Sequence, residues 1–142
     1  VQIRTGLVLG KGEGVLKKIV PLFRLRLGSA LGSGKQYMPW IHIDDLCEIY
    51  LHAIMSSEIR GAYNAAVNDN ITNAVFSKTL AKVFKYKIWL PNVPALVLRL
   101  FLGERSNLVV TGRKISSEKI QKTGFRFEFT DLETALRNCL SI

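Results

Sequence analysis

One short stretch, H-I-D-D at residues 42–45, brings together residue types that bind metals or exchange protons. A histidine and carboxylates are common ligands of a divalent metal, and the same groups can pass a proton. Side chains alternate along a strand, so His42 and Asp44 share a face only if the strand continues to residue 44. His52 lies eight residues beyond Asp44 and is not an obvious fourth ligand. We therefore expect a buried His42 that orients backbone, a helix capped by Asp44 or Asp45, and no metal site, with metal binding as the alternative.

A glycine-rich loop, G-K-G-E-G at residues 10–14, follows a predicted strand and precedes a predicted helix. A dinucleotide-binding fingerprint would lie at such a position, but its spacing is G-x-G-x-x-G, and no acidic residue ends a second strand about 20 residues later. The G-x-x-x-x-G-K-[ST] pattern of a triphosphate-binding loop does not occur either. We do not expect this loop to hold phosphate.

The remaining reactive side chains point to no catalytic centre. Cys47 and Cys139 fall in predicted helices without a C-x-x-C pattern, so we expect both to be small buried apolar residues in a reducing cytoplasm. The chain has no serine-centred nucleophile elbow, and only two histidines could act as bases near neutral pH. We assign no catalytic residue to this chain.

The net charge of +9 is unevenly distributed: residues 1–35 carry +6, residues 36–75 carry −4 and residues 76–142 carry +7. Such a field favours anionic ligands. No nucleic-acid-binding module is recognisable, and the longest apolar stretch, residues 93–102, is far shorter than the roughly 20 residues that span a bilayer. We expect a cytoplasmic protein that binds a small molecule, with neither nucleic acid nor membrane as a partner.

A competing hypothesis makes the chain a non-catalytic module whose basic helix, residues 15–27, docks on an anionic membrane surface or nucleic acid. The two hypotheses differ over Phe23 and Leu27, which an enzyme fold would bury against a sheet and a docking helix would expose.

The hydrophobic pattern predicts strands alternating with helices, which indicates an α/β fold with mostly parallel strands. Pro21 should kink or split the first helix. Thr72 and Thr130 are the expected caps of two later helices, and Ser116 or Ser117 of a third. The expected strands are residues 1–9, 37–43, 61–66 and 125–129, and the expected helices are residues 15–27, 44–55, 73–84, 95–102, 105–110, 117–123 and 131–140. These strands are too few for a complete doubly wound sheet, so the chain looks like the end of a larger fold.

Several motifs, taken in order, resemble one family: R-x-G-x-V-L-G at residues 4–10, W-I-H-I-D-D-L at 40–46, G-x-Y-N at 61–64, N-x-x-F at 73–76, L-G-E at 102–104 and G-F-x-F at 124–127. The chain resembles the C-terminal half of an extended short-chain dehydrogenase/reductase of the NAD-dependent epimerase/dehydratase-like group, over essentially its whole length. This resemblance implies the last strands and helices of a Rossmann-like doubly wound fold in residues 1–92. It also implies a small, mostly helical substrate-side domain in residues 93–142.

The resemblance further implies a substrate-binding half of an NAD(P)-dependent epimerase or oxidoreductase similar to nucleotide-sugar epimerases. The glycine-rich cofactor motif and the catalytic Tyr-x-x-x-Lys pair of that family are both missing, since the residues four positions after the tyrosines are Ile41, Ile54, Val67 and Leu90. We expect NAD(P) to bind the full-length parent and not this chain alone, which should be inactive. The chain starts without methionine, so we expect further chain before Val1.

Two groups of site residues follow from the same resemblance. Gly6, Leu7 and Val8 should approach the nicotinamide, largely through backbone. Lys35, Gln36, Met38 and Trp40 should line a partly apolar substrate pocket. Met38 stands where nucleotide-sugar epimerases carry a phosphate-binding arginine. A sheet divided between two halves of a fold would expose an edge and apolar faces, so we also expect self-association into a homo-oligomer.

Overall fold

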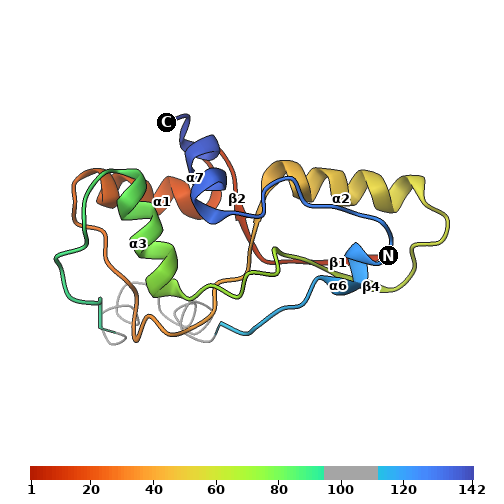
Figure 1. Cartoon of the computed structure of the whole chain (residues 1–142), viewed down its shortest axis with the longest axis horizontal. Helices are drawn as coiled ribbons and strands as arrows, with labels where there is room; N and C mark the ends of the chain where they lie inside the picture. Colours follow the sequence, from red (N-terminus) through yellow and green to blue (C-terminus); the bar gives the residue numbers. More distant parts are fainter. Residues whose placement is uncertain (95–111) are drawn as a thin grey trace.

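The protein is a mixed α/β structure with parallel strands, as the sequence predicts. The computed structural model describes residues 1–94 and 112–142. Figure 1 shows α1, α3 and α7 gathered at one end, and β1, β4 and α6 at the other, with α2 above them. The elements in chain order are β1 (Gln2–Thr5), β2 (Leu7–Leu9), α1 (Gly14–Arg24), β3 (Trp40–His42), α2 (Ile43–Met55), β4 (Ala62–Ala65), α3 (Asn73–Val83), α6 (Glu118–Gln121) and α7 (Leu132–Leu140).

The single strand predicted at residues 1–9 is divided at Gly6. β1 pairs in parallel with β4, and β2 pairs in parallel with β3. The N–H groups of the consecutive residues Gly6 and Leu7 donate to Ala65 O at 3.0 Å and Pro39 O at 2.7 Å, whereas a regular strand directs successive N–H groups to opposite edges. A Cβ atom at residue 6 would lie 2.5 Å from Pro39 O, so only glycine fits this bend.

Both partner strands lie along the same edge of residues 2–9. Val67, which follows β4, donates its N–H to Trp40 O at 2.7 Å. β3 therefore lies between β2 and the continuation of β4. The opposite edge of β1 and β2 has no strand partner among the residues that the structure describes.

Two apolar clusters form the core. The main core joins β2, α1, α3 and α7, and its largest fully buried side chains include Trp40, Phe76 and Leu136. The second core lies between α2, the β1–β4 pair and α6, and contains Ile49 and Tyr63. Since α7 packs on α3 and β2, the last helix shares its core with the first strands. The division into residues 1–92 and 93–142 stays a prediction.

The start of α2 differs from the prediction, because its cap is His42 and not an aspartate. The buried His42 accepts a hydrogen bond on Nδ1 from Asp44 N at 3.2 Å. The carboxylate of Asp45, also buried, instead accepts from two distant backbone groups, Glu128 N at 2.7 Å and Phe129 N at 3.0 Å. The predicted orienting role of His42 is confirmed, and among the described residues no cluster of three or more His, Cys, Asp or Glu side chains could hold a metal.

Other element boundaries are corrected as well. α1 passes through Pro21 unbroken and ends at Arg24. The predicted strand at residues 37–43 is confined to β3, although Tyr37 makes an isolated bridge to Thr72. The predicted strand at residues 125–129 is absent from the described chain, where this stretch is irregular.

The helix caps are partly as predicted. Thr72 caps α3 by accepting from Val75 N, as expected. Asp131, one residue after the predicted Thr130, caps α7 by accepting from Thr134 N at 2.8 Å. At the start of α6, Ser117 makes no capping bond, but Ser116, the other predicted cap, accepts from Glu118 N on its Oγ at 3.3 Å. The predicted helices at residues 95–102 and 105–110 lie outside the described residues.

Phe23 and Leu27, over which the two hypotheses differ, are not buried to the same extent. Phe23 is buried, as the enzyme hypothesis predicts, whereas Leu27 is 48% exposed. Cys139 is buried as predicted, but the prediction for Cys47 is wrong, because this residue is exposed on α2. Within residues 1–94 and 112–142, no helix is long and apolar enough to cross a membrane.

Candidate functional site

The carboxyl ends of β1 and β4 meet at one edge of the sheet. Thr5 ends β1 opposite Ala65, which ends β4, and the chain continues through Gly6 and Ala66 on either side. In open parallel sheets, ligands bind outside the carboxyl ends of the strands. This edge is therefore where the topology of the chain predicts a site.

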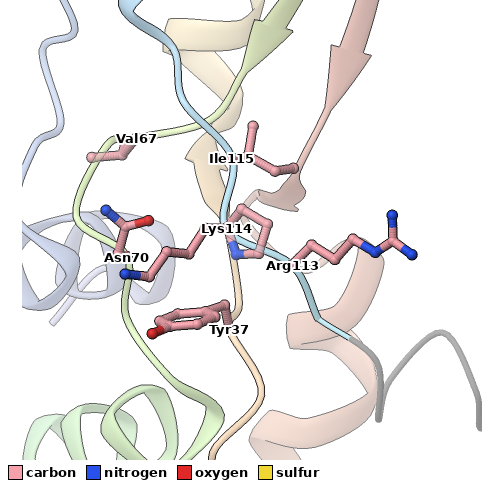
Figure 2. A pocket seen from close by; sticks show the side chains of 7 residues that line it. Tyr37, Val67, Asn70, Arg113, Lys114 and Ile115 are labelled. Atoms are coloured by element: carbon pink, nitrogen blue, oxygen red, sulfur yellow. The ribbon is translucent and has the colours of Figure 1, made fainter.

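A shallow surface depression lies beside this edge, and we call it the edge depression (Figure 2). Three chain segments contribute its lining, namely the approach to β3, the turn after β4 and the stretch before α6. The lining residues are Tyr37, Pro39, Val67, Asn70, Arg113, Lys114 and Ile115. Their side chains leave no room for a water molecule within it, so a ligand would have to lie over the depression.

The two cations of this site point in different directions. Figure 2 shows Lys114 extending over Tyr37 toward Asn70, whereas Arg113 extends to the other side of its own segment. Lys114 Nζ lies 5.0 Å from the centroid of the Tyr37 ring, which is a cation–π contact. Among the residues that the structure describes, no carboxylate lines the depression. Lys114 therefore provides one positive charge, supported by an aromatic face, where a polar ligand group could bind.

Gly112 holds the segment with Arg113 and Lys114 against the rest of the site. A Cβ atom at residue 112 would overlap Tyr37 O, so the glycine backbone rests directly on the backbone of Tyr37. Any larger residue would displace the segment. Sequence reasoning missed Gly112, Lys114 and Tyr37 as one site, because no pattern in the sequence connects positions so far apart.

The residues predicted to approach a nicotinamide lie at this same edge. Gly6 reaches it through backbone alone, and the half-buried Leu7 and Val8 pack on the main and second cores respectively. They offer backbone and aliphatic surface, and no charge. The loop at residues 10–14 leads into α1 with Glu13 at the N-cap position, and a carboxylate there would repel a phosphate. The interpretation of these residues as cofactor contacts stays a prediction.

The four residues predicted to bind substrate do not converge on the edge depression. Lys35 is exposed, whereas Gln36 is buried and donates through Nε2 to Leu31 O at 2.9 Å. Met38 is half-buried, and its sulfur accepts from the Asn73 amide at 2.9 Å. Trp40 is fully buried and exposes no surface to a ligand in this structure. The direct neighbours of Met38, Tyr37 and Pro39, line the depression instead.

Asp69 is a further polar group that sequence reasoning did not single out. Its Oδ2 atom accepts from the indole N–H of Trp40 at 2.6 Å, and its Oδ1 atom is buried with no hydrogen-bond partner among the described residues. Burial raises the pKa of the Asp69 carboxyl above its usual value; the Trp40 hydrogen bond opposes this shift, and the charge of Asp131 adds to it. Trp40 and Asp69 together fix the turn that carries Asn70.

Comparison with known proteins finds relatives over nearly the whole chain. A family model described as a domain of unknown function, DUF1731, matches residues 93–139. The human epimerase family protein SDR39U1 is 34% identical over 141 residues, which is 99% of this chain and 48% of the human protein. This chain therefore spans about half the length of the curated relatives it matches.

Solved structures agree with this relationship. The crystal structure of human SDR39U1 isoform 2 with NADPH matches with a TM-score of 0.92 and 33% identity, over 98% of this chain and 47% of that one. A nucleoside-diphosphate sugar epimerase from Corynebacterium glutamicum matches with a TM-score of 0.73 and 27% identity, over 97% of this chain and 25% of that one. The predicted Rossmann-like character of the fold is confirmed by these neighbours.

Proposed function

Since this chain corresponds to the C-terminal half of an extended short-chain dehydrogenase/reductase of the epimerase family, we propose that it forms the substrate-side half of an NAD(P)-dependent oxidoreductase or epimerase. The cofactor's phosphates and the catalytic proton donor would come from the other half of that fold.

One observation carries this proposal. The bend at Gly6 brings the carboxyl end of β1 next to Pro39, whose backbone carbonyl is bonded to Leu7 N at 2.7 Å. Pro39 in turn lines the edge depression together with Lys114. The strand end expected to meet a nicotinamide and a depression able to meet a substrate are therefore next to one another, at the edge where this class of sheet binds ligands.

Gly6, Leu7 and Val8 would suit the nicotinamide end of the cofactor better than its pyrophosphate. A planar ring needs a flat, weakly polar surface, which a glycine backbone and half-buried aliphatic side chains supply. A pyrophosphate needs free backbone N–H groups or cations, and here the Gly6 and Leu7 N–H groups are already used within the sheet. We therefore infer that this chain alone does not hold NAD(P).

The bound cofactor would supply hydride transfer, and the residues of this chain would position the other reactant. Lys114 and Asn70 would bind a polar or anionic substrate group over the depression, while Tyr37 and Val67 would exclude water from its apolar part. Met38 does not take the place of a phosphate-binding arginine, because its sulfur is bonded to Asn73 and it packs on the main core. Among the described residues that line the depression, Lys114 would take the phosphate-binding role of that arginine.

A chimera tests the proposal: this chain replaces the matching C-terminal part of human SDR39U1. We expect the folded chimera to enhance NADPH fluorescence and to oxidise NADPH with a compound from a panel of nucleotide sugars, aldehydes and ketones. The Lys114→Met chimera should keep NADPH binding and show a higher KM for that compound, whereas Lys17→Met on the exposed side of α1 should change neither. A folded chimera that does not bind NADPH, or micromolar binding by the 142-residue chain alone, would disprove the proposal.

A further inference from the structure

An open groove runs along one flank of α2, where the segment of residues 123–129 lies against this helix. Its volume is about 490 Å³, so, unlike the edge depression, it has room for the side chains of a binding partner. Hydrogen bonds join its two walls: Asp45 accepts from Glu128 N. At the other end, His52 Nε2 lies 2.8 Å from Thr123 Oγ1. The residues that line this α2 groove are Asp45, Glu48, Leu51, His52, Met55, Gly124, Phe125, Arg126 and Glu128.

The α2 groove is acidic at one end and apolar at the other. Glu48 and Glu128 lie toward the start of α2, and both are exposed. Within residues 1–94 and 112–142, neither carboxylate forms an ion pair. Leu51 and Met55 lie toward the end of α2, and they are 50% and 85% exposed. A partner that fits this groove must therefore be basic at one end and apolar at the other.

The outward face of α1 has this complementary chemistry. Lys18, Leu22 and the C-cap residue Leu25 follow one another at steps of four and three, so they form one stripe along the helix. This α1 stripe lies opposite the buried side of the helix, which carries Leu16 and Val20. Leu22 and Leu25 are 50% and 69% exposed. Lys18 is exposed as well, and it forms no ion pair with any described residue.

The α1 stripe and the α2 groove also agree in length. Lys18 and Leu25 are seven positions apart, and so are Glu48 and Met55, which is about 10 Å along a helix in each case. If the two helices lie side by side in the same direction, Lys18 meets the acidic end of the groove and the leucines meet the apolar end. In the reverse direction, the lysine would lie over Met55 and the leucines over the carboxylates. The agreement therefore specifies the direction of the contact.

One copy of the chain does not pair its own two surfaces. Figure 1 shows α1 at one end of the molecule and α2 running away from it toward the other end. A contact between the α1 stripe of one copy and the α2 groove of a second leaves one stripe and one groove unused. Such a head-to-tail contact does not close on itself and can be repeated.

We propose that the α1 stripe of one copy binds in the α2 groove of a second copy, so that the chain assembles head to tail in a concentration-dependent manner. The charges of the two regions favour this contact, since residues 1–35 carry +6 and residues 36–75 carry −4. One helix face in one groove is a small interface, so the contact should be weak and reversible. The proposal does not depend on the proposed function, and its surface differs from the open sheet edge.

Two variants that each disable one surface test the head-to-tail arrangement. Leu22→Lys with Leu25→Lys removes the apolar part of the α1 stripe, and Leu51→Lys with Met55→Lys removes that of the α2 groove. Each variant alone should stay monomeric in sedimentation velocity at concentrations where the unmodified chain assembles. Their equimolar mixture should form a one-to-one dimer and nothing larger, because it retains one intact stripe and one intact groove. Circular dichroism of each variant checks that the helices are intact.

A matched pair of charge reversals tests the acidic end of the contact. Lys18→Glu should weaken assembly roughly tenfold, because an attraction to the groove carboxylates becomes a repulsion. Lys17→Glu changes the net charge equally on the neighbouring flank of α1, which lies outside the α1 stripe, and should leave the affinity within about threefold. Raising the salt concentration from about 0.1 M to about 1 M should weaken assembly of the unmodified chain, because the Debye length falls from about 10 Å to about 3 Å.

The two methionines of the chain report on the contact directly. Met55 lies in the α2 groove, whereas Met38 is half-buried against the main core. With carbon-13-labelled methionine methyl groups, the NMR signal of Met55 should shift as the protein concentration rises. The signal of Met38 should stay in place and serves as the internal control.

Three results would overturn the proposal. An unmodified chain that stays monomeric at millimolar concentration would leave the groove to a different basic partner or to none. Assembly that both double variants leave unchanged would assign self-association to another surface, such as the open sheet edge. A mixture of the two double variants that stays monomeric would show that the stripe and the groove do not bind one another.

Discussion

Asp45 Oδ1 accepts a hydrogen bond from Glu128 N at 2.7 Å, across 83 residues of sequence. The other oxygen of the same carboxylate accepts from Phe129 N at 3.0 Å. One buried side chain at the start of α2 thus satisfies two backbone donors of the stretch that leads into α7. This contact also helps to explain why residues 125–129 alternate like a strand without forming one, since the N–H groups of Glu128 and Phe129 bond to a side chain.

Asp45→Asn should destabilise the fold by about 2–4 kcal/mol, because an amide replaces one acceptor oxygen by a donor and leaves a buried N–H without a partner. Urea unfolding followed by tryptophan fluorescence measures this loss. Asp44→Asn is the matched control: its side chain is 64% exposed, and the change should cost less than about 1 kcal/mol. Equal losses in the two variants would show that the Asp45 contacts do not stabilise the fold.

Gly6→Ala should disrupt both strand pairs, because the new Cβ atom would lie 2.5 Å from Pro39 O, a backbone atom that cannot move without moving β3. We expect a loss of several kcal/mol in unfolding free energy, or failure to fold. Gly10→Ala is the control, since a Cβ there meets only side-chain atoms of Ile43 at 3.7–3.8 Å. A Gly6→Ala protein as stable as Gly10→Ala in a denaturant titration would contradict this account of the bend.

Gly112→Ala should lift the segment with Lys114 away from Tyr37, because the new methyl group would overlap Tyr37 O. The Tyr37 ring signals in an NMR spectrum should shift, and stability should fall by about 1–3 kcal/mol. Lys114→Met keeps the segment in place and removes only a solvent-exposed cation–π contact, so its effect on stability should be at most about 1 kcal/mol. Unchanged Tyr37 signals in Gly112→Ala would mean that the glycine does not position this segment.

The two cysteines should differ strongly in reactivity. Cys47 is exposed, whereas burial raises the pKa of the Cys139 thiol to about 11 from its ordinary value of 9.0. A thiol reagent near pH 8 should modify one cysteine quickly and the second only on unfolding, and mass spectrometry should identify the fast site as Cys47. Rapid modification of Cys139 in the folded chain would contradict its burial.

The raised pKa of the Cys139 thiol also makes the stability of the fold depend on pH. Between about pH 9 and 11 the unfolded thiol of Cys139 loses its proton while the folded thiol keeps it, so the native state binds more protons and its stability falls as pH rises through this window. Cys139→Ala should show a smaller decline over that range than the unmodified chain, in thermal unfolding followed by circular dichroism. If Cys139→Ala and the unmodified chain lose the same stability over this pH range, the loss comes from other titrating groups.

Local patterns predicted the elements well where the decisive interaction is local. Thr72 caps α3 through a residue three positions away, and the apolar spacing of α2 and α3 follows from the helix period alone. The predictions were wrong where a backbone group far away in the sequence determines the local structure. Gly6 divides a strand because of the carbonyl of Pro39, and Asp45 is no cap because the residues before α7 use both of its oxygens.

The site was less predictable than the fold. Gly6, Leu7 and Val8 lie at the predicted sheet edge, yet of the residues expected to bind substrate, Gln36 and Trp40 are buried in structural roles. The edge depression instead combines three segments whose meeting depends on the contact of Gly112 with Tyr37. The spacing of residues within one segment does not predict that three distant segments come together in the fold.

The position of α7 in the main core also bears on how the chain is made. α7 packs against β2 and α3, so the apolar surface of α1 and β2 stays incomplete until nearly the whole sequence has left the ribosome. Long-range contacts of this kind slow folding and leave partly folded chains open to aggregation. During synthesis, the apolar surface of α1 and β2 would therefore be covered only once α7 has also been made.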